Sequence, residues 1–95
     1  MTTVQLRRYE LYPEVVDQFL AWFDDVLAVR AEFGFKVEFA YLNRESSEFT
    51  WAVSHEADFD AVEADYLASP GRANLSQGIP SWFSAAHIAK VDVIK

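Results

Sequence analysis

Apolar and polar residues alternate along four short stretches of this chain, and such alternation is typical of strands that bury one face. The stretches are residues 4–11, 35–43, 48–55 and 87–94. The first is the least regular, because Arg7 and Arg8 interrupt it. A polar turn over residues 43–47 separates the second from the third, so these two stretches predict a hairpin.

The segment 13–33 predicts a long helix. Pro13 suits the first helical turn, where its missing N–H would have no partner, and Glu14 and Asp17 suit the positive end of the helix dipole. Gly34 follows the last apolar position, and glycine readily adopts the left-handed conformation that ends many helices.

Asp58 is the predicted N-cap of a second helix, residues 59–68. Residues 69–75 predict a further short turn and residues 76–84 a loop. The order β-α-β-β-α-β predicts an α+β fold of the ferredoxin-like kind: a four-stranded antiparallel sheet with two helices on one face. The strand-helix-strand crossovers are expected to be right-handed.

The predicted sheet has two unlike faces. The first carries bulky side chains and is expected to pack under the helices: Phe35, Val37, Phe39, Tyr41, Phe49, Trp51 and Val53. The second is small and apolar at its centre, with charged residues around it: Ala40, Leu42, Thr50 and Ala52. An antiparallel sheet can leave such a face in water, so the pattern permits a dimer interface without requiring one.

The first helix carries more apolar residues than one sheet needs. At about 100° per residue its apolar positions sweep roughly 200°, while a surface helix usually has a stripe only a little wider than 100°. The excess is centred on Trp22 and Val29. We expect these two residues to meet either a partner subunit, which we favour, or the loop that carries Trp82.

Composition restricts the partners. The 95 residues predict one domain, residues 1–95, and a chain this short gains stability by association. Eight basic and 15 acidic residues give a net charge of -7, which argues against nucleic acid and anionic membrane as partners. No apolar run approaches the length of a membrane span, and residues 1–9 lack the apolar core of a secretion signal. With no cysteine, thiol chemistry is excluded, and we expect a cytoplasmic protein.

Four segments resemble the NIPSNAP family in their order and spacing. They are LRRYEL at residues 6–11, VRAEFGF at 29–35, EFTW at 48–51 and YLASPGR at 66–72. The resemblance covers about residues 4–73. It implies the dimeric α/β-barrel superfamily, in which two ferredoxin-like sheets face one another. That superfamily includes cofactor-free monooxygenases of the antibiotic-biosynthesis type, small isomerases and cyclases, and haem-binding members. The resemblance thus implies a homodimer and a pocket between sheet and helices, but no catalytic motif.

Arg30 is the most informative single residue. It falls in the apolar arc of the first helix, where an unpaired guanidinium is very costly. In a structural role, Arg30 complements the helix dipole and pairs with a sheet carboxylate such as Glu10 or Glu38. In a functional role, it orients a carboxylate or enolate of a bound ligand.

The two histidines, His55 and His87, fall at strand ends and are a weak metal signal, because zinc sites usually have three or four protein ligands. A haem group needs only one axial histidine, but we expect neither metal nor cofactor. The structural interpretation makes both residues polar strand ends. The alternative is an acid or base in a pocket.

Several aromatic residues are candidates for the wall of a cavity, with core packing as the alternative: Tyr9, Phe39, Tyr41, Phe49 and Trp51. Trp82 and Phe83, on the predicted loop, are candidates for a lid or a dimer contact.

Three hypotheses follow. The first is a homodimer that binds a small apolar or aromatic ligand between the first helix and the sheet, through Arg30, Tyr9, Phe39, Tyr41 and Trp51. The second is a cofactor-independent monooxygenase, isomerase or cyclase, with His55 or Tyr41 as acid or base, Arg30 as clamp and Trp51 as pocket wall. The third is a protein-interaction module that uses the loop aromatics.

Overall fold

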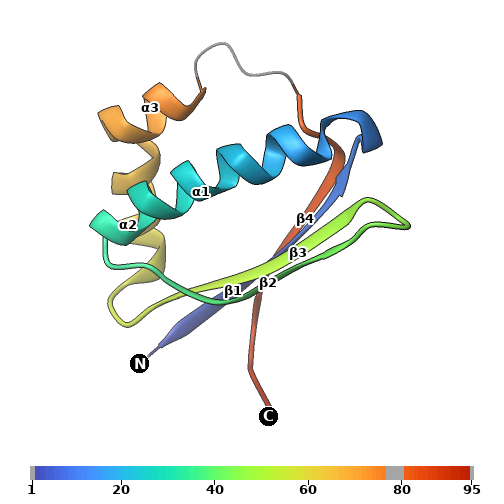
Figure 1. Cartoon of the computed structure of the whole chain (residues 1–95). Coiled ribbons are helices and arrows are strands. Elements are labelled where there is room, and N and C mark those ends of the chain that lie inside the picture. Colours follow the sequence, from blue (N-terminus) through green and yellow to red (C-terminus); the bar gives the residue numbers. More distant parts are fainter. Residues whose placement is uncertain (1, 77–80, 95) are drawn as a thin grey trace.

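The computed structural model describes residues 2–76 and 81–94. The elements are β1 (Thr3–Leu11), η1 (Pro13–Val15, a 3₁₀ turn), α1 (Val16–Glu32), β2 (Lys36–Asn43), β3 (Glu48–His55), α2 (Phe59–Leu67), α3 (Pro70–Ser76) and β4 (Phe83–Val91). The described strands form one antiparallel sheet in the order β2-β3-β1-β4. The described helices lie on one side of this sheet (Figure 1). The predicted α+β, ferredoxin-like fold is confirmed.

The last strand begins earlier than predicted, at Phe83 rather than residue 87, because the segment pairs with β1 along almost its whole length. Part of the predicted loop 76–84, residues 77–80, lies outside the described residues. None of the described helices is both long enough and apolar enough to cross a membrane.

The predicted ends of the first helix are confirmed. Pro13 opens η1, which runs directly into α1. After α1, Gly34 has a φ of 85°, and the N–H groups of Phe33 and Gly34 donate to the carbonyls of Arg30 and Ala31. These bonds satisfy carbonyl groups that the end of a helix otherwise leaves without a partner.

An irregularity in β2 reverses the direction of two side chains. Val37 pairs with Val53, but Phe39 pairs with Ala52, so the register shifts at Glu38. Because side chains alternate along a strand, the extra residue turns Phe39 and Tyr41 to the face without helices. Their predicted position under the helices is therefore wrong: Phe39 is 43% exposed and Tyr41 59% exposed.

The core between α1 and the sheet is filled by aromatic rings. Phe23 of α1 meets Phe49 and Trp51 of β3 edge to face, each with ring centroids 4.8 Å apart. Phe19 meets Phe49 at 5.0 Å. In the described structure these rings occupy the centre of the region where the sequence predicts a ligand pocket, so any ligand on this side lies closer to the edges of the helix layer.

A third helix, α3, covers the apolar excess of α1. Trp22 donates its Nε1–H to the carbonyl of Leu75 at 2.9 Å and packs against Trp82 at 5.6 Å between ring centroids. Gly71 lies so close to Val29 that an added Cβ would sit 3.1 Å from its methyl group. Trp22 and Val29 therefore meet α3 and Trp82 of the same chain, which is the second alternative expected from the sequence rather than the favoured partner subunit.

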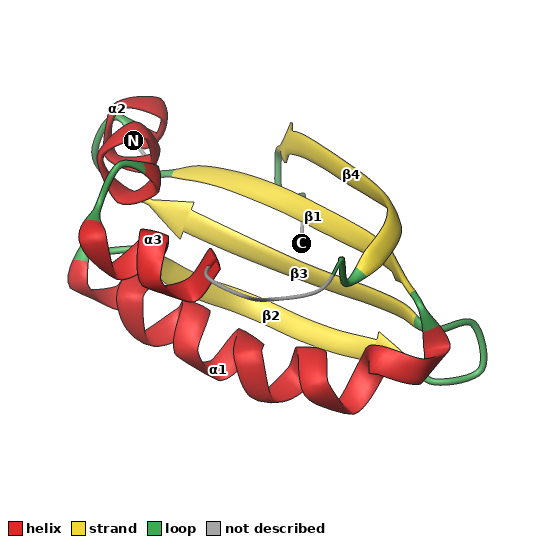
Figure 2. Cartoon of the chain, turned by 90° about the horizontal axis from the view of Figure 1, so that it is seen from above, coloured by secondary structure: helices red, strands yellow, loops and turns green. Residues whose placement is uncertain are grey.

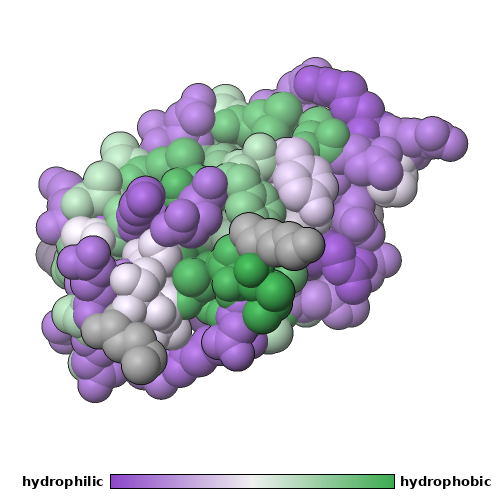
Figure 3. Space-filling model, turned by 90° about the horizontal axis from the view of Figure 1, so that it is seen from below, coloured by the Kyte–Doolittle hydropathy of each residue, from purple (hydrophilic) through white to green (hydrophobic). Residues whose placement is uncertain are grey.

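The sheet is covered unevenly. Seen from above, α1 lies along the β2 side and β4 forms the opposite edge (Figure 2). Ile88 of β4 is exposed although its strand neighbour is Arg7, which faces the helices. The other side of the sheet, called the open face below, carries none of the described helices. Hydrophobic residues occupy much of its middle and hydrophilic residues much of its rim (Figure 3).

Candidate functional site

Arg30 lies in the last turn of α1 with its guanidinium buried between the helices and the sheet. The residue is only 4% exposed. Its guanidinium carbon lies 4.4 Å from the ring centroid of Tyr66, 5.0 Å from that of Phe35 and 5.3 Å from that of Trp51. Ring faces stabilise a cation, but they do not replace the hydrogen bonds that a guanidinium makes in water.

The carboxylate closest to Arg30 belongs to neither residue expected from the sequence. Arg30 Nη2 lies 3.5 Å from Oε1 of Glu63, on α2. Glu10 instead meets His87 at 2.8 Å, because it alternates with the inward-facing residues of β1 and so lies on the open face. Glu38 lies at the β2 irregularity and accepts a hydrogen bond from Ser54. The predicted partners Glu10 and Glu38 are therefore wrong.

A second guanidinium joins the first. Arg7 of β1 donates through Nη1 to Oε1 of Gln5 at 3.0 Å and to Oε1 of Glu63 at 3.3 Å. It also lies over the ring of Trp51, at 5.8 Å. The Arg7 and Glu63 side chains are 15% and 17% exposed, so they form the outer side of the cluster. We call Arg7, Arg30, Glu63 and Trp51 the arginine cluster.

The arginine cluster contains donors without acceptors. In the part of the chain that the structure describes, Nε of Arg7, Nε and Nη1 of Arg30, and Nε1 of Trp51 are buried and have no hydrogen-bond partner. Burial, followed by the charge of Arg7, lowers the pKa of Arg30, while Tyr66 and Glu63 act in the opposite direction. Burial raises the pKa of Tyr66, and the charge of Arg30 partly offsets this. The cluster thus offers positive charge and free N–H groups, but little acceptor capacity.

The sequence interpretation missed Arg7 and Glu63. Arg7 interrupts the apolar pattern of the first strand, but it is in phase with Tyr9 and Leu11, which are buried. This phase was an available signal. Glu63 gave no comparable signal, because only the folded chain brings α2 next to β1.

His55 serves the backbone. Its Nδ1 accepts from the N–H of Ala57 at 3.0 Å, which places the proton on Nε2. Nε2 then donates to the carbonyl of Phe33, at 2.8 Å, at the end of α1. Both ring nitrogens are therefore engaged in holding the α1–β2 turn. Across the described residues, no group of three or more His, Cys, Asp and Glu side chains is placed to hold a metal ion.

The five predicted ligand-binding residues do not lie on one side of the sheet. Arg30, Tyr9 and Trp51 are brought together on the helix side. Phe39 and Tyr41 lie on the open face, where they stack on each other at 5.8 Å. A single cavity within one chain therefore does not contain all five. Tyr41 is separated by the sheet from the clamp and the wall that the enzyme hypothesis assigns to Arg30 and Trp51.

Of the two predicted loop aromatics, Trp82 lies inside the molecule and Phe83 is partly buried against the core. Trp82 is buried and meets Phe19 and Trp22, and Phe83 stacks on Tyr9 with ring centroids 4.7 Å apart. In this structure they belong to the core cluster rather than to an exposed lid or contact surface.

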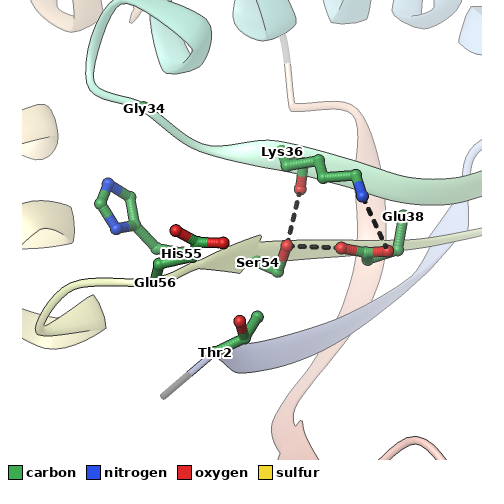
Figure 4. A pocket seen from close by; sticks show the side chains of 7 residues that line it. All are labelled: Thr2, Gly34, Lys36, Glu38, Ser54, His55 and Glu56. Carbon is green, nitrogen blue, oxygen red and sulfur yellow. Dashed lines mark hydrogen bonds and ion pairs between the residues drawn. The ribbon is translucent and has the colours of Figure 1, made fainter.

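A cavity of about 370 Å³ lies at the edge of the sheet, at the far end of β3 from the hairpin (Figure 4). Its lining is formed by Thr2, Gly34, Lys36, Glu38, Ser54, His55 and Glu56. Ser54 donates to Oε2 of Glu38 at 2.6 Å, and Nζ of Lys36 lies 3.9 Å from the same carboxylate. Ser54, Glu38 and Lys36 thus meet one another's polar groups, whereas the arginine cluster, among the described residues, has buried donors without partners. The arginine cluster is therefore the stronger candidate for a ligand site.

Among the comparisons with known proteins, only the search of solved structures finds similar proteins. No protein-family model matches the sequence, and a search of curated proteins finds no match. Among solved structures, a NIPSNAP domain protein from Burkholderia xenovorans superposes with a TM-score of 0.81, at 13% identity over 98% of this chain and 94% of the other. A NIPSNAP-like domain protein from the same organism gives 0.83, at 15% identity over 98% and 85%.

A putative antibiotic biosynthesis monooxygenase from Bacteroides thetaiotaomicron gives a TM-score of 0.77, at 20% identity over 99% of this chain and 90% of the other. At these identities the likeness shows a shared fold. The chain has the fold of NIPSNAP domain proteins and of proteins similar to antibiotic biosynthesis monooxygenases, and the resemblance found in the sequence is confirmed at that level.

Proposed function

We propose that this chain is a NIPSNAP-like protein that acts as a homodimer and binds a small ligand with an apolar or aromatic body on the helix side of its sheet, beside Arg30. The observation that carries the ligand is the set of buried donors without partners in the arginine cluster. Leaving a buried polar group unpaired costs about 1–3 kcal/mol, and more when it is charged. A bound molecule removes that cost, and the neighbouring rings offer it an apolar wall.

The open face supports the dimer. Phe39 and Tyr41 form an exposed aromatic pair there, beside the small side chains Thr50 and Ala52 of β3. An exposed pair of aromatic side chains suits packing against a second copy of the same sheet, because aromatic residues are enriched at such interfaces. The resemblance of the sequence to the NIPSNAP family adds the expectation of two sheets facing one another.

The charges on the open face are already paired within the chain. Arg8 meets Glu48 at 3.0 Å, and His87 meets Glu10 at 2.8 Å. The Arg8–Glu48 pair reduces the cost of bringing two chains together, each with a net charge of -7, because its opposite charges offset one another on the approaching face.

The dimer is tested by native mass spectrometry and light scattering on the wild type and two variants. Tyr41→Glu places a charge on the open face, and Leu67→Glu places one at a similarly exposed position on α2, 55% against 59%. We expect a dimeric wild type, a monomeric Tyr41→Glu and a dimeric Leu67→Glu. A wild type that stays monomeric at high micromolar concentration contradicts the dimer.

The ligand is tested by native mass spectrometry of protein purified from its own host, with the mass of the chain compared before and after denaturation. We expect a co-purified small molecule that is absent from Arg30→Met and retained in Arg44→Met. Arg44 is an exposed arginine whose nearest carboxylate, Asp17, lies 3.8 Å away, so it is a matched control. Circular dichroism establishes that Arg30→Met is folded. Equal retention by both variants contradicts a site beside Arg30.

The enzyme alternative finds no support in the positions of its predicted residues. The nitrogens of His55 are held by backbone groups, and Tyr41 lies on the other side of the sheet from Arg30. The activity in the name of the Bacteroides protein is therefore not proposed for this chain. The interaction-module alternative depends on exposed loop aromatics, and Trp82 is buried, so this alternative is not supported.

A further inference from the structure

The charges of the arginine cluster do not balance. Two guanidinium groups, Arg7 and Arg30, meet one carboxylate, Glu63, so the cluster has a formal charge of +1. The protein as a whole carries -7, so this is a local excess of positive charge in an acidic molecule. A charge removed from water is tolerated when it is paired and fully hydrogen-bonded. Here two cations share one carboxylate, and three of their N–H groups have no hydrogen-bond partner in the described structure.

Glu63 is a poor partner for both arginines. Its Oε1 lies 3.3 Å from Arg7 and 3.5 Å from Arg30, and Gln5 donates to its Oε2 at 3.5 Å. Charge-assisted hydrogen bonds between a guanidinium and a carboxylate are typically about 2.7–2.9 Å long. Glu63 therefore reaches the cluster from α2 without coming within the distance at which an oxyanion binds strongly.

The unpartnered donors point to the missing partner. Nε and Nη1 of Arg30 and Nε1 of Trp51 can only donate hydrogen bonds. The indole of Trp51 lies against both guanidiniums, at 5.8 Å from Arg7 and 5.3 Å from Arg30. A group that satisfies them must consist of acceptors, and one negative charge brings the cluster to neutrality. A neutral molecule can supply the acceptors but not the negative charge, and a cation does not bring the cluster to neutrality.

We infer that the arginine cluster is an anion site, which binds the carboxylate of a small aromatic acid beside Arg7 and Arg30 and next to the indole of Trp51, with Glu63 as a weakly held neighbour. This inference rests on the proposed function and adds the chemical class of the ligand. The planar body of the acid extends toward the uncovered β4 side, where Ile88 is exposed and the Arg7 side chain reaches solvent.

The first experiment compares an acid with its neutral isostere. Binding of 2-naphthoate and of 2-naphthamide to the full chain is measured by isothermal titration calorimetry, and the bound position is mapped by NMR on the Trp51 indole N–H. Because the acid gains charge-assisted hydrogen bonds that the amide lacks, we expect it to bind at least about tenfold more tightly. Equal affinities for the acid and the amide overturn the anion site but leave the proposed function standing. If neither probe binds, the anion site is also overturned.

The second experiment removes the internal carboxylate. Glu63→Gln leaves both guanidiniums without a counter-charge, so we expect 2-naphthoate to bind about tenfold more tightly and to raise the melting temperature more than it does in the wild type. Asp60→Asn is the matched control, because it removes a carboxylate from the same helix, where Asp60 meets Lys90 at 2.7 Å. An equal gain in Asp60→Asn reduces the effect to net charge and contradicts the site.

The identity of the co-purified molecule separates the two proposals. A neutral co-purified molecule that is lost in Arg30→Met supports the proposed function and overturns the anion site. An aromatic acid lost in the same variant supports both.

Discussion

At the scale of single residues, the turn after α1 depends on Gly34 and His55. Gly34 was predicted from its place after the last apolar position, and its φ of 85° confirms the reason. The role of His55 was not predictable, because its partners Phe33 and Ala57 lie near it only after β3 pairs within the sheet. The sequence allowed a catalytic role for His55, but in the structure both ring nitrogens bind backbone groups.

Gly34→Ala is expected to lower the free energy of unfolding by about 1–2 kcal/mol. The added Cβ takes a backbone conformation that favours glycine and would lie 3.0 Å from Nε2 of His55. Urea unfolding followed by circular dichroism measures the loss. Gly34→Asn is the control, because asparagine tolerates a positive φ but carries the same Cβ. If both variants match the wild type, Gly34 is not required by this turn.

Tyr66 is expected to make the protein less stable in alkali. Burial raises its pKa in the folded chain, so the folded state keeps the phenol proton while the unfolded state releases it above about pH 10. Its contribution to stability is therefore complete below that pH and is lost as the pH rises toward the folded pKa. The free energy of unfolding, measured in urea at pH 9, 10 and 11, should fall more steeply with pH for the wild type than for Tyr66→Phe. Parallel curves would show that Tyr66 ionises equally in both states.

At the scale of elements, β2 shows where a strand pattern misleads. Its boundaries were predicted to within one residue, but the faces of Phe39 and Tyr41 were assigned by strict alternation. The shift at Glu38 arises from how β2 pairs with β3, and pairing is a property of two strands that neither sequence reveals alone. Leu42 packs against the core cluster as a result.

Substitutions at two adjacent residues test the faces of β2. Leu42→Ala is expected to cost about 2 kcal/mol of unfolding free energy, because it removes core contacts, and Tyr41→Ala less than about 1 kcal/mol in dilute solution. Chemical unfolding at low micromolar concentration measures both. The reverse order of the two losses would restore the regular strand of the sequence interpretation.

At the scale of the whole molecule, element order was predictable and the site was not. Each helix and strand has a local signal, such as Pro13, Asp58 or the polar hairpin turn, and local signals sum to a topology. The arginine cluster joins Arg7, Arg30 and Glu63 from three separate elements. Only folding brings their charges together, so the local excess of positive charge cannot be seen in the sequence. The covering of Trp22 by α3 is similar, because the short turn predicted there gave no indication of which surface it meets.

The melting temperature is expected to rise with protein concentration, because association stabilises the folded chain by mass action. Differential scanning fluorimetry from 1 to 100 µM should show an upward shift for the wild type and Leu67→Glu. Tyr41→Glu should melt at one temperature throughout. A wild-type melting temperature that does not change with protein concentration would show that no dimer forms between 1 and 100 µM.

The contact of Trp51 with Arg7 and Arg30 has a practical consequence. An indole in contact with two cations in the interior of a protein experiences a strong electric field, and its ultraviolet emission depends on that field. A negative charge arriving between the guanidiniums changes the field at this ring far more than at Trp22 or Trp82. Binding of the proposed anion is therefore expected to shift the emission wavelength of Trp51, so unlabelled candidate compounds can be screened by fluorescence.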